Sequence, residues 1–225
     1  MNKNIPHLSE SLNGQSKRLR TRAVLIEASV ELFATMGYAE TTLEAVAQKA
    51  NLHVQTLYRY FPNKELLAVA PEQDNLDSFK VALGEKHPNQ TFTSFWREWA
   101  EKSANHTQTH YREMHLQRSR SLQTPSVLSQ AHMLANEYLN LMETGIADEL
   151  RLDPKTSDYP RLFAAMLWEG TYRAHNKWVG DQGRSDVVEL VTKIIDDVCR
   201  LMQLWKSAKL LASGKETHTS RVTVV

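Results

Sequence analysis

The chain has 225 residues, of which 41% are hydrophobic and 24% charged, the balance of a globular protein that can bury its own core. Its 27 Lys and Arg residues nearly match its 26 Asp and Glu residues, so a net charge of +1 does not by itself indicate a nucleic-acid partner. No apolar run approaches the about 18–20 residues of a membrane span, the N-terminus lacks the apolar stretch of a signal peptide, and a single Cys199 excludes an internal disulfide. We therefore expect a cytoplasmic protein with no membrane contact.

A basic cluster lies near the N-terminus: Lys17, Arg18, Arg20 and Arg22. No acidic residue lies between Ser11 and Val24, so the positive charge is locally uncompensated. The cluster is either a solvated basic terminus or a segment that touches phosphates. We expect residues 1–15 and the polar residues 213–225 to be flexible.

The first helix is predicted from about Lys17 to Met36, where apolar residues recur at helical spacing and form one buried stripe: Leu25, Ala28, Leu32, Phe33 and Met36. Gly37 ends it, because glycine readily adopts the left-handed conformation of a helix C-terminus.

The second helix is predicted to begin at Thr41, with Glu44 three residues later completing a capping box. Asn51 suits the tight turn that follows it. A third helix spans about His53 to Phe61 and ends before a proline, and Asn63 caps a fourth.

Two short helices joined by a tight turn are typical of a DNA-binding helix-turn-helix. Helical spacing in the third helix predicts an inward side that anchors it: Val54, Leu57, Tyr58 and Phe61. The predicted outward side carries groups that recognise base edges: Gln55, Thr56, Arg59 and Tyr60. An amide suits adenine, a guanidinium suits guanine, and threonine can contact either a polar edge or the thymine methyl.

The segment from Arg18 to Leu67 closely resembles the N-terminal DNA-binding domain of the TetR family, without a gap in spacing. The resemblance rests on Thr21 to Ala28, Leu32-Phe33, Gly37-Tyr38, Thr41-Thr42, Ala47 and Thr56 to Glu65. It implies an all-α protein with a three-helix DNA-binding domain at 16–67 and a larger helical ligand-binding and dimerisation domain at 68–212. It also implies a regulator, by default a repressor, that binds a palindromic double-stranded operator.

The resemblance assigns base contacts to Val54, Gln55, Thr56 and Arg59. It assigns phosphate contacts to Thr42, Tyr58, Tyr60 and Lys64. Two alternatives stay open, because Tyr58 can belong mainly to the core and Lys64 can be merely solvated.

Three positions depart from the family pattern. Asn51 replaces a turn glycine, His53 replaces a capping serine, and Gln55 replaces a small residue. Histidine caps helices poorly, so His53 is free to face DNA instead. These changes leave the fold secure but leave the operator sequence open.

Helices are predicted near 64–86, 91–122, 126–152, 157–179 and 185–212. Pro71 is interpreted either as a hinge within the first of these or as the start of a new helix. The last helix is apolar over about half its circumference, more than the roughly 100° stripe that one core needs. We therefore expect a homodimer through helices 157–179 and 185–212, the alternative being that the last helix is central to its own fold.

Aromatic and methionine side chains of the middle helices are the candidates to line a pocket for an unidentified hydrophobic or flat ligand: Trp96, Trp99, Tyr111, Met114, Met133, Tyr138, Trp168 and Tyr172. His106, His110 and His115 have metal-like spacing, but no carboxylate or cysteine completes a recognisable site, and we expect no metal or cofactor. We find no nucleophile motif or phosphate loop, so we do not expect an enzyme. The rival function is a DNA-binding architectural or cell-cycle factor without a ligand.

Overall fold

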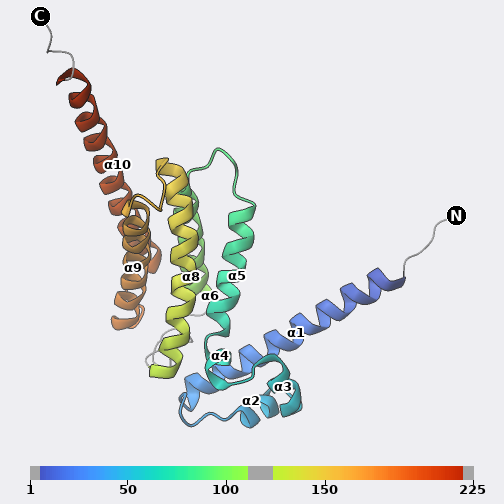
Figure 1. Cartoon of the computed structure of the whole chain (residues 1–225). Helices are drawn as coiled ribbons and strands as arrows, with labels where there is room; N and C mark the ends of the chain where they lie inside the picture. The colour runs from blue at the N-terminus through green and yellow to red at the C-terminus, as the bar shows by residue number, and fades with distance from the viewer. Residues whose placement is uncertain (1–5, 111–123, 220–225) are drawn as a thin grey trace, which may run out of the picture. The chain divides into compact units, whose positions relative to one another are not determined.

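The computed structural model describes the backbone of residues 6–110 and 124–219 and the side chains of 16–109 and 124–211 (Figure 1). All the regular structure in these ranges is helical, which confirms the predicted all-α class. The chain forms two compact units: residues 1–81 with 113–135, and residues 82–112 with 136–225. The first therefore contains the predicted DNA-binding domain together with the beginning of helix α8.

In the first unit, α1 (Pro6–Thr35), α2 (Leu43–Lys49), α3 (Val54–Tyr60) and α4 (Lys64–Ala68) surround one apolar core. The buried side chains of this core come from all four helices and the adjoining turns: Leu25, Ala28, Val46, Ala47, Leu57, Phe61, Leu67 and Ala70. A second cluster in the same unit joins Phe33, Ala68 and Val69 to Val127 of α8 (Pro125–Leu150). The start of α8 thus packs on the helix-turn-helix domain.

Several local predictions hold. Asn51 has φ of 53° and Gly37 has φ of 89°, so both take the left-handed turn conformation predicted for them. Asn63 caps α4, its side-chain oxygen accepting the Leu66 N–H at 2.8 Å. His53 precedes α3 without making a side-chain capping bond, as its chemistry predicted.

The predicted capping box at Thr41 is wrong by one residue. Thr42 is the N-cap of α2, and its Oγ1 accepts the Ala45 N–H at 3.1 Å. Thr41 is fully buried, and its hydroxyl donates to the Gly37 carbonyl at 2.8 Å, which closes the turn between α1 and α2. Two adjacent threonines offer the same capping chemistry, so the sequence alone did not distinguish them.

The ends of α1 also differ from expectation. The helix begins at Pro6, within the residues predicted to be flexible, where a proline suits the first turn. At the other end α1 stops at Thr35, so Met36 leaves the predicted buried stripe and is 51% exposed.

Pro71 lies in the first turn of α5 (Ala70–Gly84), directly after α4 ends. The structure therefore agrees with the alternative in which a new helix begins here. A proline in a first turn costs no helical hydrogen bond, because that N–H has no partner within the helix anyway.

In the second unit, α6 (Phe92–His110), the later part of α8, α9 (Tyr159–Gly180) and α10 (Val187–Thr219) pack side by side (Figure 1). Small residues allow close contacts: a Cβ on Gly145 would lie 2.1 Å from the Phe92 ring, and one on Gly170 would lie 2.3 Å from Ile194. Helix α10 continues to Thr219, past the predicted start of the flexible tail at residue 213, since no proline interrupts it.

Candidate nucleic-acid interface

Helix α3 is anchored by Leu57, which is fully buried, and by Phe61 just after its end, which is 3% exposed. Val54 packs partly against the same core. The opposite side of the helix exposes Gln55 and Arg59 to solvent. The amide and guanidinium predicted to read bases therefore lie outward, with Thr56 half-buried between the two sides.

The two tyrosines of α3 are placed in the reverse of the helical-wheel prediction. Tyr58 is 45% exposed and its hydroxyl lies 3.4 Å from a Glu44 carboxylate oxygen, whereas Tyr60 packs against the core. At about 100° per residue, both lie about 80° from the middle of the buried side, so spacing could not decide between them. Packing against the neighbouring helices determines the orientation of the two tyrosines, and Tyr58 lies on the outward side.

Arg59 and Tyr60 are linked within α3, since the guanidinium carbon lies 5.6 Å from the centre of the Tyr60 ring. A cation over an aromatic face is attracted by the ring quadrupole. Because Tyr60 is packed against the core, this contact restrains the guanidinium end of an otherwise exposed side chain.

Thr42 is exposed at the start of α2. Its oxygen is occupied by the capping bond to Ala45, but the hydroxyl proton remains a donor that can point to solvent. The position therefore permits both the structural cap and the predicted phosphate contact.

The Lys64 ammonium already has partners within the protein, unlike a solvated lysine side chain that is free to bind a phosphate. Its ammonium donates to the carbonyls of Tyr38, Ala39 and Thr41 at 2.8, 3.3 and 3.0 Å, and lies 4.3 Å from the centre of the Tyr38 ring. An ammonium has three N–H donors, so these three carbonyls use all of them. Lys64 thereby holds the turn that leads into the Thr42 cap.

Tyr38 supports the candidate site in a way that the sequence did not predict, although the Gly37-Tyr38 pair was visible in the family pattern. Its ring lies under Lys64 and packs 5.3 Å from Phe33. Burial, followed by the nearby Glu65 carboxylate, raises the pKa of Tyr38 to about 12.

In the second unit, three predicted ligand residues meet. The ring centres of Trp96 and Tyr138 are 6.5 Å apart, those of Trp96 and Trp168 6.4 Å, and those of Tyr138 and Trp168 4.7 Å. We call these three residues the aromatic cluster. Trp99 is half-buried on the same helix as Trp96.

The other predicted ligand residues are not part of this cluster. Met133 is 65% exposed and lies in the first unit, and Tyr172 is 50% exposed. Tyr111 and Met114 lie outside the described residues, as do His115 and the side chain of His110 from the metal hypothesis. Within the described part of the chain, no three metal-ligating side chains come together.

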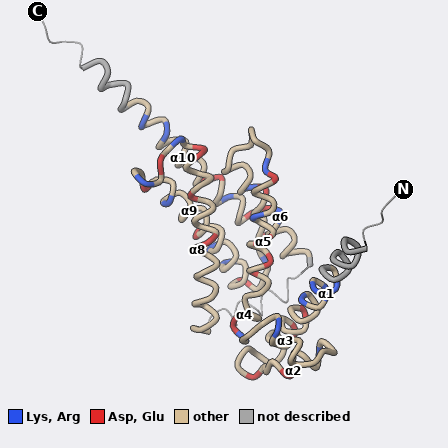
Figure 2. Tube along the Cα trace, turned by 45° about the vertical axis from the view of Figure 1, so that its right-hand side comes forward, with Lys and Arg blue, Asp and Glu red and all other residues tan. Residues whose placement is uncertain are grey.

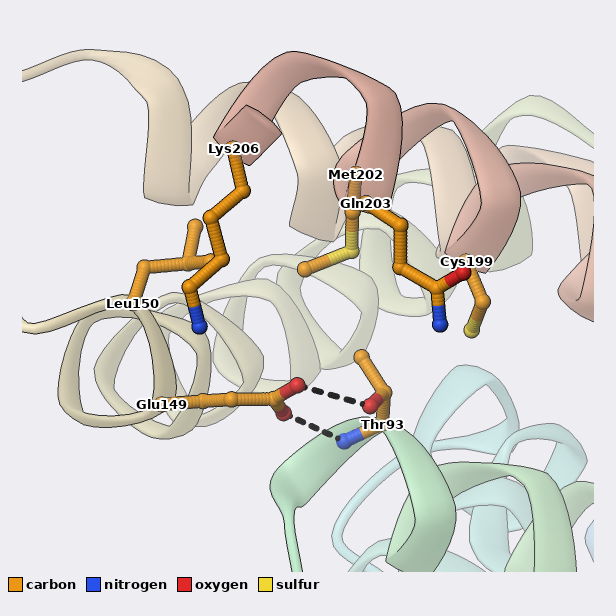
Figure 3. Close-up of a pocket in the computed structure, with 7 residues that line it drawn as sticks. All are labelled: Thr93, Glu149, Leu150, Cys199, Met202, Gln203 and Lys206. Carbon is orange, nitrogen blue, oxygen red and sulfur yellow. Dashed lines mark hydrogen bonds between the residues drawn. The ribbon is translucent and has the colours of Figure 1, made fainter. Parts of the chain in front are cut away.

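A small cavity of about 180 Å³ lies elsewhere in the second unit, where α10 meets the end of α8 and the start of α6 (Figure 3). Glu149 accepts from both the backbone N–H and the hydroxyl of Thr93 at 2.9 Å, which caps α6. Burial, then the Glu149 and Asp196 carboxylates, raise the pKa of the Cys199 thiol, so this cysteine is not activated as a nucleophile. The cavity is therefore interpreted as a packing gap between capped helices.

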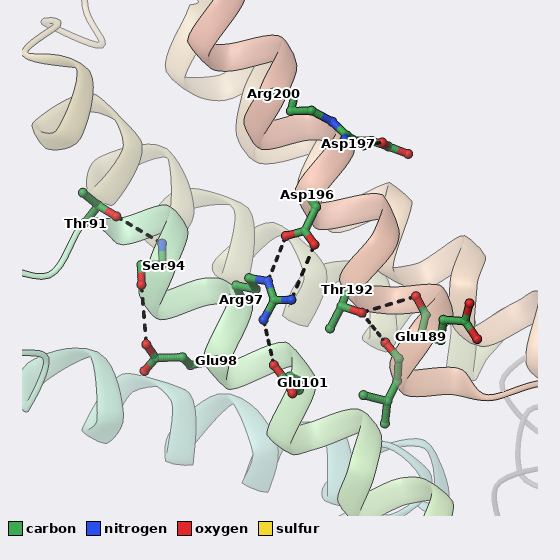
Figure 4. A network of polar contacts seen from close by, with 11 residues as sticks. Thr91, Ser94, Arg97, Glu98, Glu101, Glu189, Thr192, Asp196, Asp197 and Arg200 are labelled. Carbon is green, nitrogen blue, oxygen red and sulfur yellow. Dashed lines mark hydrogen bonds and ion pairs between the residues drawn. The ribbon is translucent and has the colours of Figure 1, made fainter.

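Arg97 ties α6 to α10 in the same unit (Figure 4). Its guanidinium donates to both carboxylate oxygens of Asp196, at 2.8 and 3.4 Å, and to Glu101 at 2.9 Å. The paired contact to Asp196 fixes orientation, because a planar guanidinium matches a carboxylate with two parallel bonds.

Helix α10 has two apolar faces side by side. One is buried within the unit: Val187, Val191, Ile195, Val198 and Met202. The other recurs at helical spacing, interrupted by Asp197, and is half-buried or exposed: Leu190, Leu201, Leu204 and Ala208. We call this second set the open apolar face; within it Leu201 is 49% and Leu204 67% exposed.

Comparison with known proteins places the site in context. Residues 25–70 match the family model described as bacterial regulatory proteins, tetR family. The chain is 39% identical over 69 residues to the HTH-type transcriptional regulator TcmR of Streptomyces glaucescens, a match that covers 31% of this chain and 30% of that protein. It is 37% identical over 67 residues to the transcriptional repressor KstR of Mycolicibacterium smegmatis, covering 30% and 33%. The sequence matches thus span about a third of these relatives' length.

Similarity of fold extends further. The solved structure of the transcriptional regulator FadR from Bacillus subtilis, in complex with stearoyl-CoA, matches with a TM-score of 0.63 and 18% identity. This match covers 78% of the present chain and 96% of that one. The similarity of fold therefore extends beyond the residues matched in sequence, at low sequence identity.

Proposed function

We propose that the chain belongs, through its N-terminal domain, to the TetR family of bacterial regulatory proteins, and that it is a DNA-binding transcriptional regulator. We further propose that it is a repressor, that it binds as a homodimer to a palindromic operator, and that a small molecule releases it. Each part is supported by a separate feature of the molecule.

DNA binding is carried by one observation: α3 turns Gln55 and Arg59 outward while Leu57, on the opposite side, is fully buried. A rigid helix with an outward row of hydrogen-bonding groups suits a major groove. We assign base contacts to Val54, Gln55, Thr56 and Arg59. Thr42, Tyr58 and Tyr60 are assigned to phosphates, and Lys64 to positioning the turn that carries Thr42.

The homodimer is supported by the open apolar face of α10. Leu201 and Leu204 gain from leaving water, and a second copy of α9 and α10 offers the matching apolar surface. Two recognition helices in such a dimer would meet successive major grooves about 34 Å apart.

The ligand is assigned to the aromatic cluster of Trp96, Tyr138 and Trp168, whose flat faces favour a hydrophobic or planar molecule. Release from DNA requires that the ligand bind the free conformation more tightly than the DNA-bound one. The similar FadR was solved with stearoyl-CoA, which supports a ligand with a long acyl chain for this fold without identifying the ligand here.

The second candidate is a DNA-binding architectural factor without a ligand. It is favoured by the tight contacts of the aromatic cluster, which leave Tyr138 only 4% exposed. We propose no enzymatic activity and a cytoplasmic location. None of the helices in the described ranges is long and apolar enough to cross a membrane.

Selection of duplexes from a random pool by the purified protein tests the proposal. We expect enrichment of a palindrome with half-sites about one helical turn apart. Repeating the binding with a panel of acyl and aromatic metabolites then separates the candidates, since only a ligand-responsive regulator releases the selected duplex. Failure to enrich any sequence would contradict the proposed function itself.

A further inference from the structure

Helix α1 carries a basic cluster beside the helix-turn-helix, and we propose that it forms a second DNA-binding surface that contacts phosphates flanking the bases read by α3. We define the basic segment as Lys17, Arg18 and Arg20. This inference rests on the proposed function, because it assigns additional contacts to the same duplex.

The three side chains of the basic segment are exposed. None of them forms an ion pair with any side chain that the structure describes. Figure 2 shows the run of basic residues on α1 next to the part of the helix whose side chains are not described. Uncompensated charge of one sign on one short stretch attracts a polyanion.

Arg22 differs from the three residues of the basic segment, and its contacts fix the position of the segment next to α3. It is partly buried, forms an ion pair with Asp74 of α5, and its guanidinium carbon lies 5.3 Å from the centre of the Phe61 ring. Phe61 is the residue that ends α3. Arg22 thus fixes this part of α1 against the C-terminal end of the recognition helix.

The basic segment continues from this anchor. Arg18 precedes Arg22 by four residues, so it lies on the same side of α1, about 6 Å further along the axis. Lys17 and Arg20 are three residues apart and share another side of α1, about 100° and 160° around the axis from Arg18, so the three cations surround this part of the helix. A duplex whose major groove receives α3 carries phosphates on both walls of that groove, so cations beyond the end of α3 are placed to meet the backbone rather than base edges.

A membrane surface is the other polyanion that such a segment can meet. Helices that lie on membranes pair a basic face with a broad apolar one. Among the described side chains of residues 16–22, only Leu19 supplies exposed apolar surface, at 68% exposure. The duplex is therefore the occupant that the side chains favour.

The test compares the full-length protein with its K17Q/R18Q/R20Q variant on the duplex that the wild type selects from a random pool. Removing one cation that neutralises a phosphate lowers the slope of log K against log salt by about 0.9. With three side chains in each of two subunits, we expect the slope to fall by about 2 to 5, with unchanged base preference. The variant K102Q/K155Q/K177Q is the matched control, because it removes the same charge from exposed lysines of the other unit.

Four results are informative. A reduced slope for the first variant only, with thermal unfolding unchanged, supports the proposal. An unchanged slope in that variant overturns it while leaving the proposed function intact. An unchanged slope with weakened binding to phosphatidylserine vesicles also overturns it, in favour of a membrane contact. If the wild type selects no duplex, the proposed function fails and the inference with it.

Discussion

Helices α3 and α10 both expose one side, but the exposed chemistry is opposite. Opposite the buried Leu57, α3 presents the polar ends of Gln55, Tyr58 and Arg59. Helix α10 presents Leu201 and Leu204 beside its buried apolar face. A row of polar side chains is stabilised by a partner that offers hydrogen bonds. A row of apolar side chains is stabilised by a partner that removes it from water. The comparison separates the proposed DNA-reading surface from the proposed dimer surface within one chain.

The largest expected effect is on the anchor of α3. Leu57→Ala should lower the free energy of unfolding of the helix-turn-helix by about 2–5 kcal/mol, since a fully buried leucine leaves a cavity. Leu66→Ala is the control, because Leu66 belongs to the same unit but is 38% exposed. Thermal unfolding of both variants measures the difference, and equal losses would show that α3 is not held by its buried side.

The open apolar face of α10 gives the next effect. Leu204→Ala should weaken the dimer by about 3 kcal/mol, roughly 1.5 kcal/mol for each subunit, because less apolar area leaves water on association. Sedimentation over a range of concentrations measures this, with Val81→Ala, 61% exposed in the other unit, as the control. Dissociation constants that match for wild type and variant would argue against this face as the interface.

The sequence predicted the helix-turn-helix closely because its signals are local. A glycine and an asparagine with positive φ, the Asn63 cap and the buried Leu57 are each determined by residues nearby in the chain. It failed where two local choices were equivalent. Thr41 and Thr42 can both cap a helix, and the orientation of Tyr58 depended on neighbouring helices.

The larger unit was less predictable for a different reason. Aromatic residues at helical spacing serve a core, a pocket or an interface equally well, so spacing could not separate the cluster around Trp96 from the exposed Tyr172 or Met133. The contact of Gly170 with Ile194 within one chain likewise depends on packing that no local pattern encodes. Side-chain chemistry in the sequence therefore identified candidates but not their partners.

A substitution of Lys64 tests whether this residue supports DNA binding by holding the turn that leads into α2. Lys64→Met keeps the length of the side chain but removes its bonds to three carbonyls, so we expect about 1.5–3 kcal/mol less stability together with weaker DNA binding. Lys49→Met is the control, since Lys49 forms only an exposed ion pair with Glu31. Weaker DNA binding with unchanged thermal unfolding would instead assign Lys64 to a phosphate.

The smallest and most specific effect concerns the outward side of α3. Arg59→Ala should lower stability by no more than about 1 kcal/mol, because the exposed side chain loses its contact with the Tyr60 ring, yet relax the preference at one base pair by about 1–3 kcal/mol. Tyr58→Phe removes a single hydroxyl from the same side. It should weaken binding to every duplex by the same factor, because a phosphate contact carries no sequence information. Binding of both variants to the selected duplex and its single-base substitutions measures the contrast. If the two substitutions lower affinity equally for every duplex, α3 contacts only the backbone, and its outward polar row does not read sequence.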